Sequence, residues 1–160
     1  MAADWHDGRG VLRITADGAS REAARGAAAE ASSGVPWEAS SEGATTGASE
    51  VALEVAASYR ARTRGLLGRD GIEGALLLTP AASVHTFRMR FAIDVAYLDR
   101  RLRVLSVVTM APGRLGLPRP RSRHVLEAEA GAMARWGLRA GTRVTVERYG
   151  PAATGGVAAK

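Results

Sequence analysis

The chain has 160 residues and a formal net charge of +6; 46% of it is hydrophobic, 5% is aromatic, and none of it is cysteine. This length suits one domain with a modest core, and the missing cysteines exclude disulfides, thiol catalysis and cysteine-ligated metals. No apolar run approaches the roughly 18 residues of a membrane-spanning helix, and residues 1–10 are polar and acidic, unlike a signal peptide. We therefore expect no membrane span and a cytoplasmic location.

Composition divides the chain into three regions. Residues 1–49 are rich in Ala, Gly, Ser and Glu, and they bury too little apolar surface to offset the entropy lost on ordering. We therefore expect a flexible acidic N-terminal segment, which includes one short strand at residues 10–15. Residues 50–149 form the predicted β-rich domain, and residues 150–160 are predicted to be a disordered tail.

Hydrophobic patterning predicts several strands and two brief helices within the domain. Apolar residues alternate at Val51, Leu53 and Val55, as they do in a half-buried strand. Ser58 is suited to cap a helix that Gly68 would end. In chain order, the predicted strands cover residues 51–57, 75–79, 91–98, 102–110, 124–129 and 142–149, and the predicted helices cover residues 59–67 and 130–136. Because strands dominate, the expected fold class is mainly β: a compact small barrel or sandwich with two short helices.

A polar cluster interrupts the apolar pattern at residues 83–99. Asp94 shares a strand face with Ala92 and Ala96, where a bare carboxylate is costly unless it is paired or hydrogen-bonded. It could bind a ligand or exchange protons, or it could serve the fold by accepting backbone N–H groups or an arginine. The structural role is the favoured interpretation because satisfied buried polar groups are common. The candidate partners of Asp94 are Arg88, Arg90 and His85.

The other candidate residues flank this cluster. His85 lacks the spacing of a metal-binding motif, so we predict no metal, and we also predict no cofactor. His85 and Asp94 could act as an acid–base pair, although no nucleophile motif accompanies them. The arginine-bearing loop at residues 111–123 is the best exposed candidate for an anionic partner. The predicted ligand-binding residues are His85, Arg88, Arg90, Asp94, Glu127, Arg119 and Arg121.

Four blocks of the sequence resemble a known family. They are RGLLGRDGIEGALLL at residues 64–78, VHT with MRFAIDVAYLD within residues 84–99, RHVLEAEAGAMARWGL at residues 123–138, and Gly141 followed by Val144. In this order they resemble the bacterial and archaeal domain-of-unknown-function family 192, over about residues 51–147. The resemblance implies a mainly β domain, barrel- or sandwich-like with short helices, and it implies no activity.

The chain departs from this family in one segment. Many relatives have a Trp-Met-Lys-Asn-Thr run where this chain has residues 85–89, while Asp94 and the block at residues 125–127 match. If that tryptophan shapes a pocket in the relatives, the resemblance implies that the pocket of this chain is lined differently.

Three functions compete. The leading hypothesis is a non-enzymatic domain that binds a small polar or anionic ligand, or a protein partner, in a cleft bordered by the predicted residues. One alternative is a small hydrolase or isomerase that uses His85 and Asp94. The other is a domain that binds nucleic acid or lipid headgroups through the arginine-rich loop. Basic excess is common and nonspecific, so nucleic acid is the less favoured partner.

Overall fold

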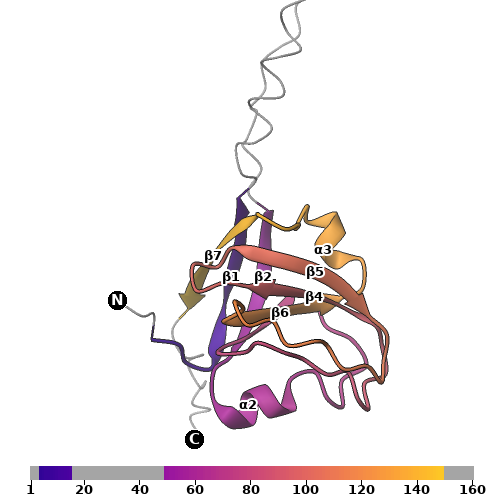
Figure 1. Cartoon of the computed structure of the whole chain (residues 1–160). Helices are drawn as coiled ribbons and strands as arrows, with labels where there is room; N and C mark the ends of the chain where they lie inside the picture. Colours follow the sequence, from indigo (N-terminus) through magenta and orange to yellow (C-terminus); the bar gives the residue numbers. More distant parts are fainter. Residues whose placement is uncertain (1–3, 16–48, 150–160) are drawn as a thin grey trace, which may run out of the picture.

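The computed structural model describes residues 4–15 and 49–149, and the expectations for residues 16–48 and 150–160 lie outside them. The described residues form two short helices and seven strands (Figure 1). The helices are α2 (Tyr59–Arg64) and α3 (Ala132–Arg135), and the strands are β1 (Gly8–Thr15), β2 (Ser49–Ala56), β3 (Ala75–Leu78), β4 (Ile93–Leu98), β5 (Val104–Met110), β6 (His124–Glu129) and β7 (Arg143–Tyr149). Among them, no helix has the length and apolar character needed to cross a membrane.

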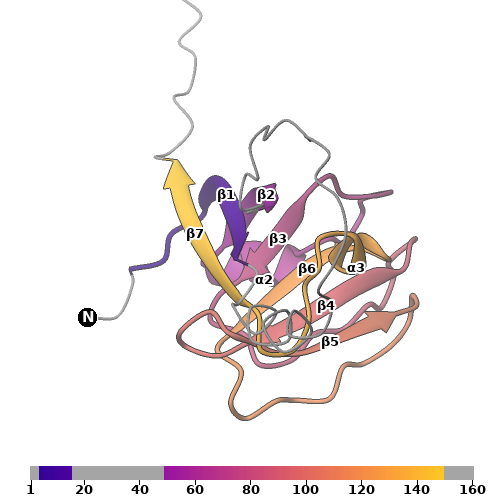
Figure 2. The same cartoon turned by 90° about the horizontal axis from the view of Figure 1, so that it is seen from above.

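All seven strands belong to one sheet, in the order β5-β4-β6-β3-β2-β1-β7. β2 and β3 run parallel and are joined through α2, whereas the other neighbours are antiparallel. The sheet curls (Figure 2), so that its two edge strands approach each other at one end. There, Arg103 and Arg143 form an antiparallel bridge, and the Val104 N–H donates to the Thr142 carbonyl at 2.8 Å. The fold is therefore mainly β, a partly closed barrel with two short helices, as the sequence predicted.

β1 is an interior member of this sheet. It pairs with β2 on one side and β7 on the other, and its Leu12 and Ile14 side chains are buried. The strand predicted at residues 10–15 is thus confirmed, and it begins two residues earlier. The sheet consequently extends beyond the predicted domain limits of 50–149 into the segment predicted to be flexible. The alternating apolar residues Leu12 and Ile14 indicate a strand at this place in the sequence. They do not indicate that β2 and β7 are its neighbours.

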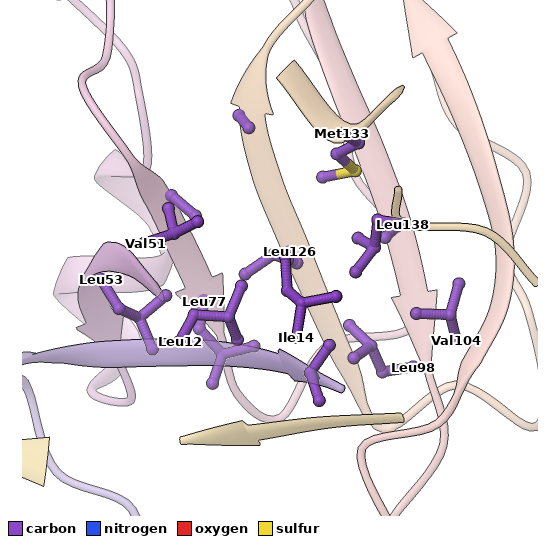
Figure 3. Close-up of a cluster of buried hydrophobic side chains, with 14 of the residues drawn as sticks. Leu12, Ile14, Val51, Leu53, Leu77, Leu98, Val104, Leu126, Met133 and Leu138 are labelled. Atoms are coloured by element: carbon purple, nitrogen blue, oxygen red, sulfur yellow. The ribbon is translucent and has the colours of Figure 1, made fainter. Parts of the chain in front are cut away.

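The sheet separates two hydrophobic cores. The inner core fills the barrel with side chains from all seven strands, and Met133 and Leu138 near α3 complete it (Figure 3). The outer core lies on the opposite face of β3, β4 and β6, and it includes Leu66 from the turn after α2 and Met89 from the connection between β3 and β4. Because these three strands have a core on each face, nearly all of their residues are buried. This double burial explains the all-apolar run of β3.

Several elements end a few residues away from their predicted limits. Ser58 caps α2 as predicted, and its Oγ accepts a hydrogen bond from the Ala61 N–H at 3.2 Å. However, α2 ends before residue 67 because Gly65 adopts φ +44° and leaves the helical conformation. The second helix, α3, has only four residues, since Gly131 at φ +84° precedes its first turn. Strands β4 and β5 each begin two residues later than predicted.

An ion pair links β2 to the turn after α2. Arg69 donates two hydrogen bonds to the Glu54 carboxylate, at 3.0 and 2.8 Å, and these bonds lower the pKa of Glu54. The two side chains are 38% and 39% exposed, so solvent screens the pair. We expect Glu54→Gln to lower the free energy of unfolding by about 0.5 kcal/mol at pH 7.

The pH dependence of this effect follows from the direction of the pKa shift. Because the folded pKa of Glu54 lies below its ordinary value of 4.5, the contribution is present above pH 4.5 and disappears as pH falls through the folded pKa. Urea unfolding of wild type and variant at pH 7 and at about pH 3 measures this difference. An equal loss at the two pH values would show that charge is not its source.

Candidate functional site

Asp94 lies on the barrel side of β4, against α3. Its Oδ1 accepts a hydrogen bond from Thr109 Oγ1 at 2.7 Å, and its Oδ2 accepts one from the Met133 N–H at 3.2 Å. Gly131 begins α3 without a side-chain cap, so Asp94 supplies from a neighbouring strand the acceptor that a capping residue normally provides. The Asp94 side chain is 3% exposed. This geometry favours the structural interpretation of the carboxylate.

Glu127 faces the opposite side of the sheet. Successive residues of a strand alternate between the two faces, so Leu126 and Ala128 point into the barrel while Glu127 points into the outer layer with Val125. The Glu127 side chain is 3% exposed, and no described residue gives its carboxyl group a hydrogen bond or an ion pair. Burial raises the pKa of this carboxyl group from 4.5 to about 7. A buried polar group without a protein partner is uncommon in folded proteins and calls for an explanation.

A small pocket lies over Glu127, with a volume of about 90 Å³. It is enclosed by α2 and the turn after it, by β3, and by the connection between β3 and β4; the lining residues are 62–67, Leu78, 83–85, Met89 and Glu127. Glu127 Oε2 lies 4.0 Å from the position that a Cβ on Gly65 would occupy. The missing side chain at Gly65 therefore leaves space beside the carboxyl group.

Of the predicted residues, only His85 joins Glu127 at this pocket. The His85 side chain is exposed, and its ring stacks on Phe87 with the ring centroids 5.3 Å apart. Asp94 belongs to the barrel face of the sheet, whereas His85 and Glu127 belong to the outer face. The structure thus does not bring His85 and Asp94 together as an acid–base pair.

The predicted arginines do not converge on the pocket. Arg88 is exposed on a turn at φ +61°, and Arg90 donates to Asp70 at 2.6 Å. The guanidinium carbon of Arg119 lies 5.3 Å from the centre of the Tyr97 ring. Arg121 lines a separate open depression of about 450 Å³, together with Asp99, Arg100, Arg101, Pro120 and Arg123. Within residues 4–15 and 49–149, no three His, Asp or Glu side chains gather as metal ligands would.

Sequence reasoning missed the wall of the pocket that comes from α2 and the following turn. Arg62, Arg64 and Gly65 all line the pocket, although none of them is among the predicted site residues. The one available signal was Gly65 itself, since a glycine directly after a helical pattern can end the helix there. The arginines at the β4–β5 turn were also not predicted to belong to any site.

Fold and pocket together define a class of protein: a small, partly closed β barrel that carries a carboxyl-lined pocket on its outer face. The chain belongs to the DUF192 family, described as "Uncharacterized ACR", whose family model matches residues 42–146. This match confirms the resemblance drawn from the sequence blocks.

Two archaeal proteins are among its relatives. A UPF0127 protein of Pyrococcus horikoshii is 32% identical over 87 residues, which cover 51% of this chain and 76% of the relative. A UPF0127 protein of Pyrococcus abyssi is 29% identical over 87 residues, which cover 51% of this chain and 74% of the relative. Neither description states an activity.

Two solved structures share the fold. One is a provisionally assigned transcription regulator of Sinorhizobium meliloti, with a TM-score of 0.62, 13% identity, and coverage of 90% of this chain and 98% of that chain. The other is a protein of unknown function from Novosphingobium aromaticivorans, with a TM-score of 0.59, 18% identity, and coverage of 84% and 83%. At these identities the likeness shows the fold alone.

Proposed function

We propose that the protein binds a small polar ligand in the pocket over Glu127. One observation carries this proposal: the Glu127 carboxyl group is buried, has no partner among the described residues, and lines the pocket. Burying a polar group without a hydrogen bond costs free energy, and a ligand that hydrogen-bonds to it would recover part of that cost. Perturbed titratable groups in clefts are candidate functional residues for this reason.

The size of the pocket limits which part of a ligand can enter. Its volume of about 90 Å³ is well below the roughly 300–1,000 Å³ of sites that enclose a drug-sized molecule. A terminal amide, carboxyl or ammonium group would fit, and the rest of the ligand would lie at the mouth. Arg64, Ser83 and His85 line the pocket with exposed side chains, which favours a ligand whose outer part is polar or anionic.

Acid–base catalysis is a second candidate function. A carboxyl group with a pKa of about 7 can donate or accept a proton at neutral pH, which is the property that general acid–base catalysis requires. His85 lines the same pocket, so His85 and Glu127 could act on one bound group. This pair replaces the pair of His85 and Asp94, whose members face opposite sides of the sheet.

A thermal-shift screen of small carboxylic acids, amides, amines and phosphates, run at pH 6 and pH 8, tests the pocket. A ligand at 100 times its Kd should stabilise the wild-type protein by about 2.7 kcal/mol. Glu127→Leu replaces the side chain with an apolar one of similar size and removes the hydrogen-bonding group. It should therefore abolish the ligand-induced rise in melting temperature.

Glu129→Gln is the matched control, because this exposed glutamate lies two residues along the same strand. It should preserve the shift. A ligand that stabilises Glu127→Leu as strongly as wild type would place binding elsewhere and contradict the proposal. Product analysis of any ligand found would then separate simple binding from catalysis.

A further inference from the structure

Two connections on the outer face of the sheet pair with each other. The Thr86 N–H donates to the Arg114 carbonyl at 2.8 Å, the Gly116 N–H donates to the Val84 carbonyl at 2.7 Å, and His85 faces Leu115 in an antiparallel bridge. The buried Thr86 hydroxyl donates to the Ala111 carbonyl at 2.7 Å and accepts from the Arg114 N–H at 2.8 Å. These bonds join the 80–92 and 111–123 connections into one ridge.

Successive residues of this ridge face alternately into the protein and toward solvent, and several of the outward-facing side chains are apolar. Val84 and Thr86 are buried, and a Cβ on Gly116 would lie 2.5 Å from the Tyr97 hydroxyl, so residue 116 also faces inward. Their neighbours face outward. Phe87, Leu115 and Leu117 are 46%, 65% and 73% exposed, and we call these three residues the apolar lip. Such a group of exposed large apolar side chains marks a site of interaction.

The charge on the two connections has one sign. Residues 80–92 and 111–123 contain six arginines and no Asp or Glu. Arg90 contacts Asp70, and Arg119 lies over Tyr97, while the other four arginines are exposed: Arg88, Arg114, Arg121 and Arg123.

Arg121 and Arg123 also line a basic depression beside the ridge. Arg121 and Arg123 surround it together with Arg100 and Arg101, and its volume is about 450 Å³. The acid in its lining, Asp99, already accepts hydrogen bonds from the N–H groups of Arg101 and Arg103 at 2.7 and 3.0 Å. Asp99 keeps its negative charge, but the four arginines outnumber it, so the lining of the depression has a net positive charge.

We propose that this surface docks the protein on an anionic lipid membrane. The apolar lip would enter the interface, and the arginines of the depression would bind headgroup phosphates, for which the planar guanidinium is well matched. Leu117 is three residues from Pro120 in the lining of the depression, so their Cα atoms are at most about 11 Å apart. A lipid headgroup in the depression would thus lie close to the part of the ridge that enters the acyl region.

The exposed side chains of Leu115 and Leu117 favour a membrane over other anionic partners. Single-stranded nucleic acid binds through a series of aromatic rings on which successive bases stack; the apolar lip has one such ring, Phe87, and that ring already stacks on His85. An acidic protein would satisfy the arginines but would need a complementary hollow for each protruding side chain. A membrane interface accepts them without a preformed hollow. This docking function does not depend on ligand binding over Glu127, although residues 83–85 and Met89 of the ridge also form one wall of that pocket.

Co-sedimentation of the full chain with lipid vesicles tests the proposal. The protein should sediment with phosphatidylcholine vesicles that contain roughly one third phosphatidylserine, should not sediment with pure phosphatidylcholine, and should be released by salt. Arg121→Gln/Arg123→Gln should weaken binding roughly 30-fold. Leu115→Ser/Leu117→Ser should weaken it at least roughly tenfold. Circular dichroism verifies that each variant remains folded.

Arg135→Gln/Arg139→Gln is the charge-matched control, because these two exposed arginines lie in and after α3 and neither of them lines the depression. It should retain most of the binding. Failure to sediment with anionic vesicles would overturn the proposal, as would equal binding to neutral vesicles. A control variant that loses as much affinity as Arg121→Gln/Arg123→Gln would overturn it too. The proposal would also be overturned if the protein bound DNA or an acidic peptide more tightly than anionic vesicles and if Leu115→Ser/Leu117→Ser did not change that binding.

Discussion

Glu127→Gln is expected to stabilise the protein by about 3 kcal/mol above pH 8. The folded carboxyl group keeps its proton up to about pH 7, whereas its ordinary pKa is 4.5. Between these values the folded state binds more protons than the unfolded state, so the stability of the wild type falls as pH rises. The favourable contribution is fully present below pH 4.5 and is lost as pH passes through about 7. Glutamine is neutral throughout and removes this loss.

Urea unfolding of wild type and Glu127→Gln between pH 4.5 and pH 8.5 measures the effect. The two proteins should differ little near pH 4.5, where the wild-type carboxyl group is neutral, and the difference should grow with pH. The exposed Glu129→Gln should follow the wild-type curve. A difference between wild type and Glu127→Gln that stays constant with pH would show that desolvation of the Glu127 carboxylate is not its cause.

Asp94→Ala is expected to lower the free energy of unfolding by about 2 kcal/mol, because it leaves the buried Met133 N–H in the first turn of α3 without an acceptor. The Thr109 hydroxyl also loses its acceptor, but Thr109 is exposed, so water can replace that bond. Asp94→Asn should cost less, since its amide oxygen can still accept from one donor while its NH₂ group faces the other. Equilibrium denaturation at pH 7 measures both variants.

Thr109→Val isolates one of these two bonds. It removes the hydroxyl at nearly constant shape and should cost about 1 kcal/mol. Ligand binding at the Glu127 pocket should survive in Asp94→Asn at a temperature where the variant is folded, because the two carboxyl groups lie on opposite faces of the sheet. If Asp94→Ala were as stable as the wild type but no longer bound ligand, Asp94 would be the ligand-binding residue and its assigned structural role would be wrong.

The candidate site shows where sequence reasoning succeeded and where it stopped. Alternation on β4 correctly placed Asp94 on a buried face, and the capping role agrees with the interpretation favoured beforehand. The expected cleft nevertheless combined Asp94 with Glu127, which the sheet separates. The face of each strand relative to its neighbours depends on register, and no local pattern in β4 or β6 specifies that register. The placement of Asp94 opposite Ala128, with Glu127 opposite Val95, is a property of the paired sheet.

The β-rich character of the chain, most strands, both helices and the exposed arginine loop follow from local patterns in the sequence. Alternating apolar residues, the Ser58 cap and the all-apolar β3 act over a few residues, so they can be recognised without a partner. Three features depend instead on contacts between distant segments: β1 inside the sheet, the pocket that α2 closes over Glu127, and the pairing of Leu115 with His85. Each joins residues 30 or more positions apart. Chain entropy opposes such contacts until the whole sheet forms, and only the folded barrel stabilises them.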